Sequence, residues 1–191
     1  GEATWFGLGD RDLATHLLRT MWLAEGVTLT EVTRRLASAL GVACRLLPAT
    51  DDPLRTMVDT AEYGTLGFQE YFVRYRWQPQ VQRVWFQAEH HCGVTSAVRE
   101  ALETADLIVV APSNPVLSIQ PILEVDGLRD LLVNRRGPCI VVSPFVAGKA
   151  VKGPADKLMR ELSLEISPRG VAMRPRTMRR SRWRGSMATF P

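Results

Sequence analysis

Small polar side chains gather directly after a strongly apolar run of the sequence. Ser113, Asn114 and Pro115 follow residues 105–112, and Ser118 lies a few positions further along. Hydroxyl and amide groups at such a place can cap a helix, whose first N–H groups also suit a phosphate. The chain has neither a dinucleotide-binding glycine pattern nor a Walker lysine motif. The segment therefore predicts either a nucleotide-phosphate site or an ordinary strand–turn–helix cap.

Two groups of neighbouring carboxylates offer a second kind of chemistry. Asp10 and Asp12 flank Arg11 at the expected start of a helix, and Asp51 and Asp52 stand just before a proline. Carboxylate oxygens are the ligands that Mg²⁺ prefers, and they can also orient a polar substrate. The same residue types are common as helix caps and in turns, so Asp10 is equally a candidate N-cap. For each pair, spacing alone favours the cap or turn over a substrate or metal site, which stays as the alternative.

The hydrophobic pattern indicates which elements must position these groups. Helical spacing predicts helices over residues 10–25 and 28–40, and Thr28 with Glu31 forms a capping box at the start of the second. Apolar or alternating runs predict strands over residues 42–47, 54–59, 65–73, 81–87, 105–112 and 138–144, with a short helix over 68–77 as an alternative. Further helices are expected over residues 95–103, 118–124, 127–134 and 154–164.

Residues 105–112 and 138–144 are apolar on both faces, as buried parallel strands are. Because these runs alternate with helices, the sequence predicts an α/β domain with a mainly parallel sheet flanked by helices. In such sheets ligands bind beyond the carboxyl ends of the strands. This is where the segment 113–118 is expected, and where Ser143 would also lie.

Composition excludes several classes of protein. The chain has 191 residues, of which 46% are hydrophobic and 23% charged, as in ordinary globular domains. Its longest apolar run, residues 107–112, is far shorter than the roughly 20 residues of a membrane-spanning helix. Three cysteines at spacings atypical of metal sites indicate a reducing cytoplasm. The N-terminus lacks a signal peptide and an initiator methionine, which predicts the interior of a longer protein.

The net charge of +4 comes from the C-terminal end of the sequence. Residues 174–191 contain six arginines and no acidic residue, and the remaining 18 basic residues face 20 acidic ones. The rest of the chain is therefore mildly acidic, and nucleic-acid binding by the whole protein is not expected. A basic tail that binds nucleic acid or acidic lipid is the alternative for this segment.

Several segments form a series of motifs in order along the chain: TWFGLGDRDLATHL (residues 4–17), LLPATDDP (46–53), FQEYFV (68–73), APSNPVLSI (111–119), and SP (143–144) followed by VKGPADK (151–157). In this order they resemble the motifs of a known family, the 2-phospho-L-lactate transferases of coenzyme F-420 biosynthesis. The resemblance covers about residues 1–173, which predicts one partial transferase-like domain over this range and a separate arginine-rich tail over residues 174–191.

The resemblance implies a Rossmann-like α/β fold and a homodimer. It also implies transfer of a phospholactyl or phosphoenolpyruvyl group from a GDP-activated donor to the deazaflavin Fo, with Mg²⁺ required and GMP released. Matching positions imply a donor side, an acceptor side with catalytic Asp10 and Asp12, and a weak metal pair. The donor side comprises Ser113, Asn114, Pro115, Ser118 and Ser143; the acceptor side adds Trp5, Gly9 and Arg11; the metal pair is Asp51 and Asp52.

Two departures from the family pattern limit the expected activity. The family begins with a strand, a glycine-rich phosphate loop and a metal-binding aspartate, and no segment of this chain resembles them. Its closing segment is replaced by the arginine-rich residues 174–191, which suggests a truncated gene or a shifted reading frame. We therefore expect an incomplete fold with weak or no transferase activity. A non-catalytic regulator that binds nucleotide sugars, as in the related gluconeogenesis-factor-like group, is the alternative.

Overall fold

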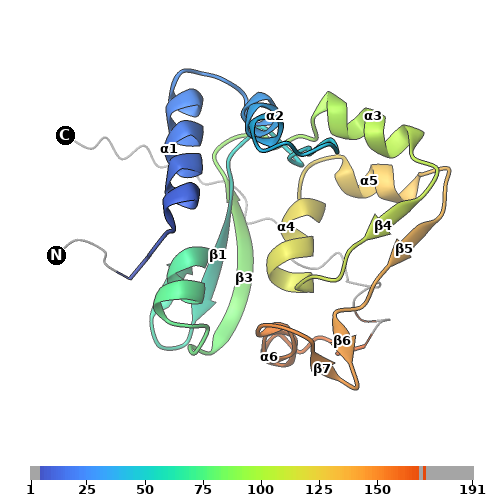
Figure 1. The fold of residues 1–191 in the computed structure, drawn as a ribbon. Coiled ribbons are helices and arrows are strands. Elements are labelled where there is room, and N and C mark those ends of the chain that lie inside the picture. Colours follow the sequence, from blue (N-terminus) through green and yellow to red (C-terminus); the bar gives the residue numbers. More distant parts are fainter. Residues whose placement is uncertain (1–4, 168–169, 171–191) are drawn as a thin grey trace.

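The computed structural model describes residues 5–167 and residue 170, and Figure 1 shows helices packed around small sheets. The elements are α1 (Asp10–Ala24), α2 (Leu29–Ala39), β1 (Leu54–Thr60), β2 (Gly64–Gly67), the π-helical turn η1 (Glu70–Arg74), β3 (Val81–Ala88), α3 (Ser96–Thr104), β4 (Ile108–Val110), the π-helical turn η2 (Pro115–Ile119), α4 (Gln120–Leu123), α5 (Leu128–Val133), β5 (Cys139–Val141), β6 (Phe145–Val146), β7 (Lys149–Ala150) and α6 (Ala155–Glu161). The arginine-rich segment 174–191 lies outside the described residues.

The strands form one parallel pair and two antiparallel groups. β4 and β5 run parallel, with Val109 opposite Ile140. β1 is the centre of an antiparallel sheet in the order β2-β1-β3, and β6 and β7 form a hairpin. The α/β class and the parallel pair are confirmed, but a mainly parallel sheet is wrong for the described residues. Three residues join β1 to β2, and so short a connection permits only an antiparallel pair.

Most predicted elements are present, although their ends differ. Thr28 and Thr95 cap α2 and α3, since their hydroxyls accept hydrogen bonds from the N–H groups of Glu31 at 3.3 Å and Val98 at 3.2 Å. The strand predicted over residues 42–47 is wrong, because this exposed segment has no strand beside it. The segment 65–73 is divided between β2 and η1, which supports the helical alternative for its second half.

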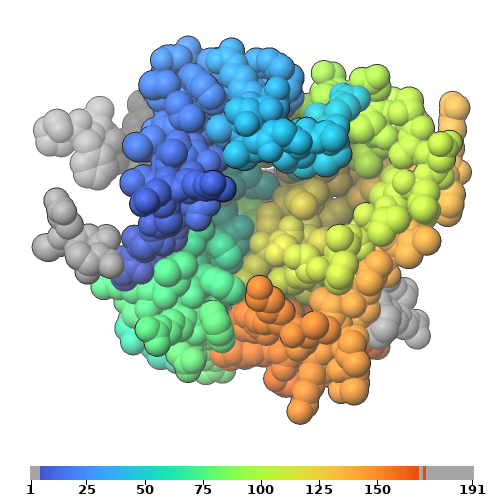
Figure 2. All heavy atoms as spheres, viewed as in Figure 1, coloured from blue at the N-terminus to red at the C-terminus, as the bar shows by residue number. Residues whose placement is uncertain are grey.

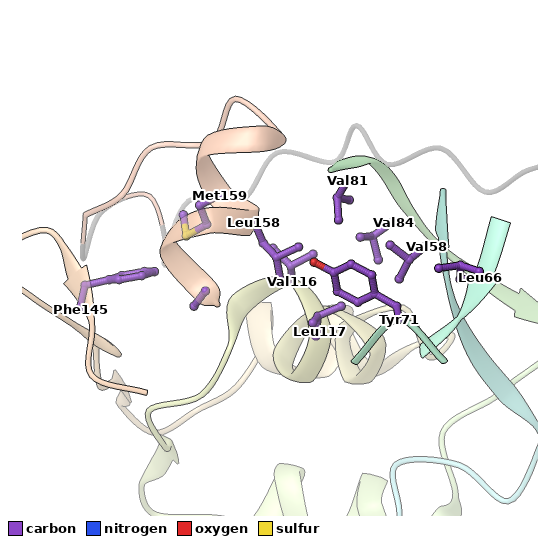
Figure 3. Packing of buried hydrophobic residues seen from close by; sticks show 11 residues of the cluster. Val58, Leu66, Tyr71, Val81, Val84, Val116, Leu117, Phe145, Leu158 and Met159 are labelled. Carbon is purple, nitrogen blue, oxygen red and sulfur yellow. The ribbon is translucent and has the colours of Figure 1, made fainter. Parts of the chain in front are cut away.

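The main core joins the antiparallel sheet to the second half of the chain (Figure 3). Val58 and Val84 from the sheet meet Val116 of η2 and Leu158 of α6, around the buried ring of Tyr71. Burial is the main cause that raises the pKa of Tyr71, so the phenol stays neutral in the folded protein. A second, smaller core links α3, α5 and the loops at residues 47–49 and 92–94.

Two apolar faces remain uncovered. Helix α1 stands at the edge of the molecule and has no buried residue, although Leu13, Leu17 and Met21 lie on it at helical spacing. The strands β4 and β5 are also largely exposed, which contradicts the prediction of strands buried on both faces. The physical reason is that the described residues provide no layer to cover one face of this pair.

Ionisation of Glu31 is expected to make the stability of the protein depend on pH. Its carboxylate accepts hydrogen bonds from Arg34 at 2.7 Å and Arg35 at 2.9 Å, which lower its pKa from 4.5 to about 2. A lowered pKa stabilises the folded state above about pH 4.5 and loses this effect as the pH falls towards 2. At pH 7 the Tm of Glu31→Gln should therefore be lower than that of the unchanged chain. A difference that persists undiminished at pH 2.5 would contradict the assignment.

Glu161 is expected to hold α6 against the start of β3. Its Oε2 atom accepts hydrogen bonds from the backbone N–H of Val81 at 3.0 Å and from Lys157 Nζ at 2.8 Å. Replacing Glu161 by alanine removes the acceptor from two partly buried donors, so it should cost about 1–2 kcal/mol of unfolding free energy. Urea unfolding of Glu161→Ala and Glu161→Gln measures this. Glutamine keeps an acceptor oxygen and should lose less, and equal losses would contradict the role of the hydrogen bonds.

Candidate donor-binding loop and carboxylate pair

Asn114 shapes the loop that follows β4. Its Oδ1 atom accepts hydrogen bonds from the backbone N–H groups of Val116 at 2.9 Å and Leu117 at 3.0 Å, and its carbonyl accepts from Ser118 and Ile119. Pro115 begins η2 and is buried. Because proline has no backbone N–H, this first position of the helix leaves no donor without an acceptor. The side chain thus acts as the helix cap that the residue types allow. Any phosphate at this turn must be bound by groups other than these two N–H donors.

The remaining polar groups of the loop have the character of ligand contacts. The hydroxyls of Ser113 and Ser118 and the amide nitrogen of Asn114 make no hydrogen bond within the described residues, and all three residues are half-buried. Half-buried donors without a protein partner are available to a polar ligand. The geometry is therefore compatible with the expectation that this segment holds donor-side groups.

Ser143 follows the strand that pairs with β4. Because β4 and β5 are parallel, their carboxyl ends lie at one edge, and Ser113, Asn114 and Ser143 all come after this edge. The Ser143 hydroxyl accepts a hydrogen bond from the N–H of Phe145 at 3.1 Å and so shapes the turn into β6. The topology brings both predicted serine-containing segments to the edge where ligands of such sheets bind.

Asp51 and Asp52 hold three segments together. Asp51 Oδ1 accepts from the N–H of Thr30 at 2.6 Å and so caps α2 from outside the helix. Asp52 Oδ2 accepts from the N–H of Gly93 at 3.3 Å, and its own N–H donates to the Thr50 hydroxyl at 3.1 Å. The pair thus ties its loop to α2 and to the segment after β3. One oxygen of each carboxylate makes no hydrogen bond in the described part of the chain.

A third metal-ligating side chain does not join this pair. Among residues 5–167 and 170, no group of three or more histidine, cysteine, aspartate or glutamate side chains could hold a metal ion. Mg²⁺ is commonly bound by one or two carboxylates together with substrate phosphates and water. The free oxygens of Asp51 and Asp52 fit this manner of binding, but they do not form an all-protein metal site.

The acceptor-side residues lie on a different element from the donor loop. Gly9, and not Asp10, is the N-cap of α1, because its backbone is extended and its carbonyl accepts from the N–H of Leu13 at 2.8 Å. Asp10 and Asp12 occupy the first turn of α1 and are exposed, as is Arg11. Trp5 packs edge-on against Phe6. In Figure 1, β1 and β3 stand between α1 and β4, so the two predicted sides are not brought into contact.

Two structural features, one after η1 and one after β3, could not be predicted from the sequence. Arg76 and Trp77 both have positive φ angles, of 48° and 50°, although neither is a glycine or an asparagine. His91 Nδ1 lies 2.7 Å from Asp126 Oδ2, across a segment that also carries the Gly93 contact to Asp52. A histidine in a loop gives no sequence indication of a partner 35 positions away, because Asp126 is brought there by backbone hydrogen bonds with Cys92 and Val94.

The face of the molecule shown in Figure 2 is hollowed between the blue helices α1 and α2 and the yellow segment around α4. η2 leads directly into α4, so the loop at residues 111–119 adjoins the segment on one side of this hollow. The loop at Asp51 contacts the first turn of α2. Asp52 contacts Gly93, which pairs with Asp126 shortly after the end of α4. None of the described helices is long and apolar enough to span a bilayer.

The fold is similar to that of a solved UPF0052-family protein from Bacillus halodurans. Two crystal structures of it match with TM-scores of 0.51 and 0.53, at 19% identity, over 65% and 68% of this chain and 39% and 40% of that protein. Likeness at this identity concerns the fold alone. Together with the parallel pair and its flanking helices, it supports an incomplete Rossmann-like α/β fold.

Curated relatives are much more similar in sequence. The 2-phospho-L-lactate transferase of Methanosarcina acetivorans is 42% identical over 86% of this chain and 53% of its own length. The phosphoenolpyruvate transferase of Mycolicibacterium smegmatis is 39% identical over 89% of this chain and 54% of its own. The chain thus spans about half the length of these relatives. The model of the family "2-phospho-L-lactate transferase CofD" matches residues 3–178, and the chain belongs to this family.

Proposed function

We propose that this chain is part of a transferase that moves a phospho-three-carbon-acid group from a GDP-activated donor to a hydroxyl of the deazaflavin Fo, with release of GMP. The observation that carries the proposal is family membership over residues 3–178, which includes the loop after β4. The listed relatives named for 2-phospho-L-lactate are 38–42% identical and those named for phosphoenolpyruvate are 39% identical, so identity does not distinguish the two groups. The proposal therefore covers either acid as the transferred group.

In this proposal the loop after β4 binds the donor. The Asn114 amide and the hydroxyls of Ser113 and Ser118 are the free donors, and phosphate oxygens are acceptors that such groups recognise. Ser143 shapes the neighbouring turn at the same edge of the parallel pair. The chemistry is phosphoryl transfer, in which positioning and neutralisation of charge provide most of the catalysis.

Asp51 and Asp52 would hold Mg²⁺ through their free oxygens, together with phosphates of the donor. The ion supplies charge neutralisation when it is bound. The other oxygens of the two carboxylates keep the loop against α2 and Gly93, so the pair is both a structural link and a candidate ligand set. Trp5, Gly9 and Arg11 with Asp10 and Asp12 would face the acceptor, with the two aspartates as candidate catalytic groups. For these residues to act in the reaction, another polypeptide segment must place α1 next to the reacting atoms.

Two measurements test the proposed function. The first is titration of the full chain with Fo, followed by deazaflavin fluorescence, with and without Mg²⁺ and GDP. The second is release of GMP from the activated donor, measured by chromatography. Saturable Fo binding is expected, and Ser113→Ala should weaken GDP binding while Ser38→Ala, an exposed serine at the end of α2, should not. A folded chain that binds neither Fo nor GDP would refute the proposal.

The cysteines bear on the cellular setting that we propose. The cysteines Cys44, Cys92 and Cys139 are free thiols, as expected of a reducing compartment, and we therefore place the protein in the cytoplasm. A homodimer is proposed from the family resemblance. Sedimentation of the purified chain over a range of concentrations tests it.

A further inference from the structure

The hairpin β6–β7 begins shortly after Ser143, at the carboxyl edge of the parallel pair. Its two turn residues, Ala147 and Gly148, have positive φ angles of 49° and 75°. Positive φ at both central positions is the property of the tight type I′ turn, which joins strands directly opposite each other. Val146 accordingly pairs with Lys149 across the turn. The turn thus fixes the register of the whole hairpin.

The same register continues beyond the two short strands. The N–H of Val151 donates to the carbonyl of Pro144 at 3.0 Å, which adds the next pair of the antiparallel ladder. Continued by one further position, this register sets Lys152 opposite Ser143. Hydrogen-bonded pairs alternate with pairs that share no hydrogen bond, and in the latter the opposing side chains come closest. The pair of Lys152 and Ser143 is of this second kind.

Side-chain alternation separates two lysines of this segment, because successive residues of a strand point to opposite faces. Lys149 shares a face with Val146, which is 67% exposed, so this face is turned to solvent. Lys152 and Ser143 share the other face with Phe145, which is buried in the main core (Figure 3). Lys152 therefore lies at the rim of the inward face, and Lys149 on the outer face.

The inward face of the hairpin adjoins the candidate donor loop. Helix α6 begins three residues after Lys152 and packs against both β7 and η2. Ala155 at the start of α6 and Val116 of η2 belong to the same buried core. In Figure 1 the hairpin and α6 lie together below α4, which follows η2. The segment that carries Lys152 is thus fixed beside the loop at residues 111–119.

The donor loop has no positive charge of its own. Residues 111–119 contain neither lysine nor arginine, and the available donors of Ser113, Asn114 and Ser118 are neutral. A nucleoside diphosphate carries several negative charges, and hydrogen bonds to phosphate from a charged donor are roughly twice as strong as those from a neutral one. A cation from a neighbouring segment is therefore expected at a site for such a ligand.

Lysine is rare in this chain and is confined to this segment. Of the 24 basic residues 21 are arginines, and the three lysines all lie within residues 149–157. Lys157 has a structural role, because its Nζ atom donates to the carbonyl of Pro79 and to Glu161, each at 2.8 Å. Lys152 is exposed and makes neither a hydrogen bond nor an ion pair within the described residues. Its ammonium group is a compact charge of the kind that binds phosphate.

We propose that Lys152 binds the phosphate groups of the donor at the edge where Ser113, Asn114 and Ser143 lie. The lysine neutralises phosphate charge, and the loop contributes directional hydrogen bonds. The inference rests on the proposed function for the identity of the nucleotide. The contact itself requires only a diphosphate group, so inorganic pyrophosphate is a second probe that does not depend on the guanosine.

Isothermal titration of the full chain with GDP and with pyrophosphate tests the proposal. Lys152→Ala should weaken the binding of both by at least about tenfold, as loss of a charged hydrogen bond does. Lys149→Ala is the matched control, because it removes the same charge from the outer face of the same hairpin, and it should change the affinity less than about twofold. Lys152→Arg keeps the charge and should keep most of the affinity.

The salt dependence of binding is a readout that a merely structural role would not change. Salt screens an ionic contact, so the affinity of the unchanged chain for pyrophosphate should fall as the salt concentration rises. This dependence should be weaker in Lys152→Ala and unaltered in Lys149→Ala. Because Lys152 is exposed, urea unfolding of Lys152→Ala should match that of the unchanged chain.

The outcomes separate this inference from the proposed function. Equal affinities of Lys152→Ala and the unchanged chain would overturn the inference, and so would equal losses in Lys152→Ala and Lys149→Ala. Pyrophosphate binding that depends on Lys152, without any binding of GDP, would support the phosphate contact and refute the guanosine donor. A folded chain that binds neither probe would overturn both.

Discussion

Replacement of Leu158 by alanine is expected to lower the free energy of unfolding by about 2–5 kcal/mol. Leu158 is fully buried in α6 and packs in the core that also contains Val116 and Val84. Figure 3 shows it between η2 and the rest of α6, where a cavity would lie at the junction of the two halves of the chain. Because single domains are stable by only about 5–15 kcal/mol, this loss is a large part of the total.

Urea unfolding followed by circular dichroism measures this effect. The matched control is Leu17→Ala in α1, which removes the same atoms from a side chain that is 62% exposed. It should change the free energy by less than about 0.5 kcal/mol. A loss at Leu17 as large as that at Leu158 would mean that α1 is covered in solution, in contradiction to the described arrangement.

Replacement of Asn114 by alanine is expected to cost about 2–3 kcal/mol and to disorganise the candidate donor loop. The change removes the cap of η2 and leaves the N–H groups of Val116 and Leu117 without an acceptor. Two partly buried N–H donors left unpaired cost about 1–3 kcal/mol each, and this figure already contains the cost of about 0.5–2 kcal/mol that loss of a cap has by itself. Both residues lie in the main core, so the loss affects packing as well as the loop.

Asn114→Asp separates the structural role from the ligand role. Aspartate keeps an acceptor oxygen for both N–H groups, so its unfolding free energy should lie within about 1 kcal/mol of that of the unchanged chain. It removes the amide donor and adds a negative charge, so the affinity for GDP should fall at least about tenfold if the loop binds phosphate. Isothermal titration with GDP checks this, and unchanged affinity in Asn114→Asp would remove Asn114 from the donor site.

Local patterns were sufficient for the helices that carry their own signals. Thr28 with Glu31 predicted the start of α2, because a hydroxyl cap acts within three residues of itself. The helix predicted over residues 95–103 is confirmed as α3, and the structure adds that Thr95 is its cap. The alternating run at residues 81–87 predicted β3, because a strand places successive side chains on opposite faces and this alternation is visible within the run itself. Asp10 was wrongly predicted as the N-cap of α1, since Gly9 takes that place and the local sequence permits either.

Burial of the strands could not be predicted in the same way. Residues 105–112 and 138–144 read as strands covered on both faces, and the structure shows short strands with one bare face. An apolar run indicates a preference for burial, but another segment must supply the covering layer. In residues 42–47 the apolar run forms no strand, because no other strand lies beside it.

The sequence by itself determined the family, the α/β class and the residue types of the candidate site. These follow from ordered motifs and from interactions that act over a few positions. Only the tertiary structure decided that Asn114 uses its side-chain oxygen as a helix cap, that Asp51 caps α2, and that α1 stands apart from the loop after β4. Such contacts join segments far apart in the chain, and their partners are chosen by packing, which no local spacing records.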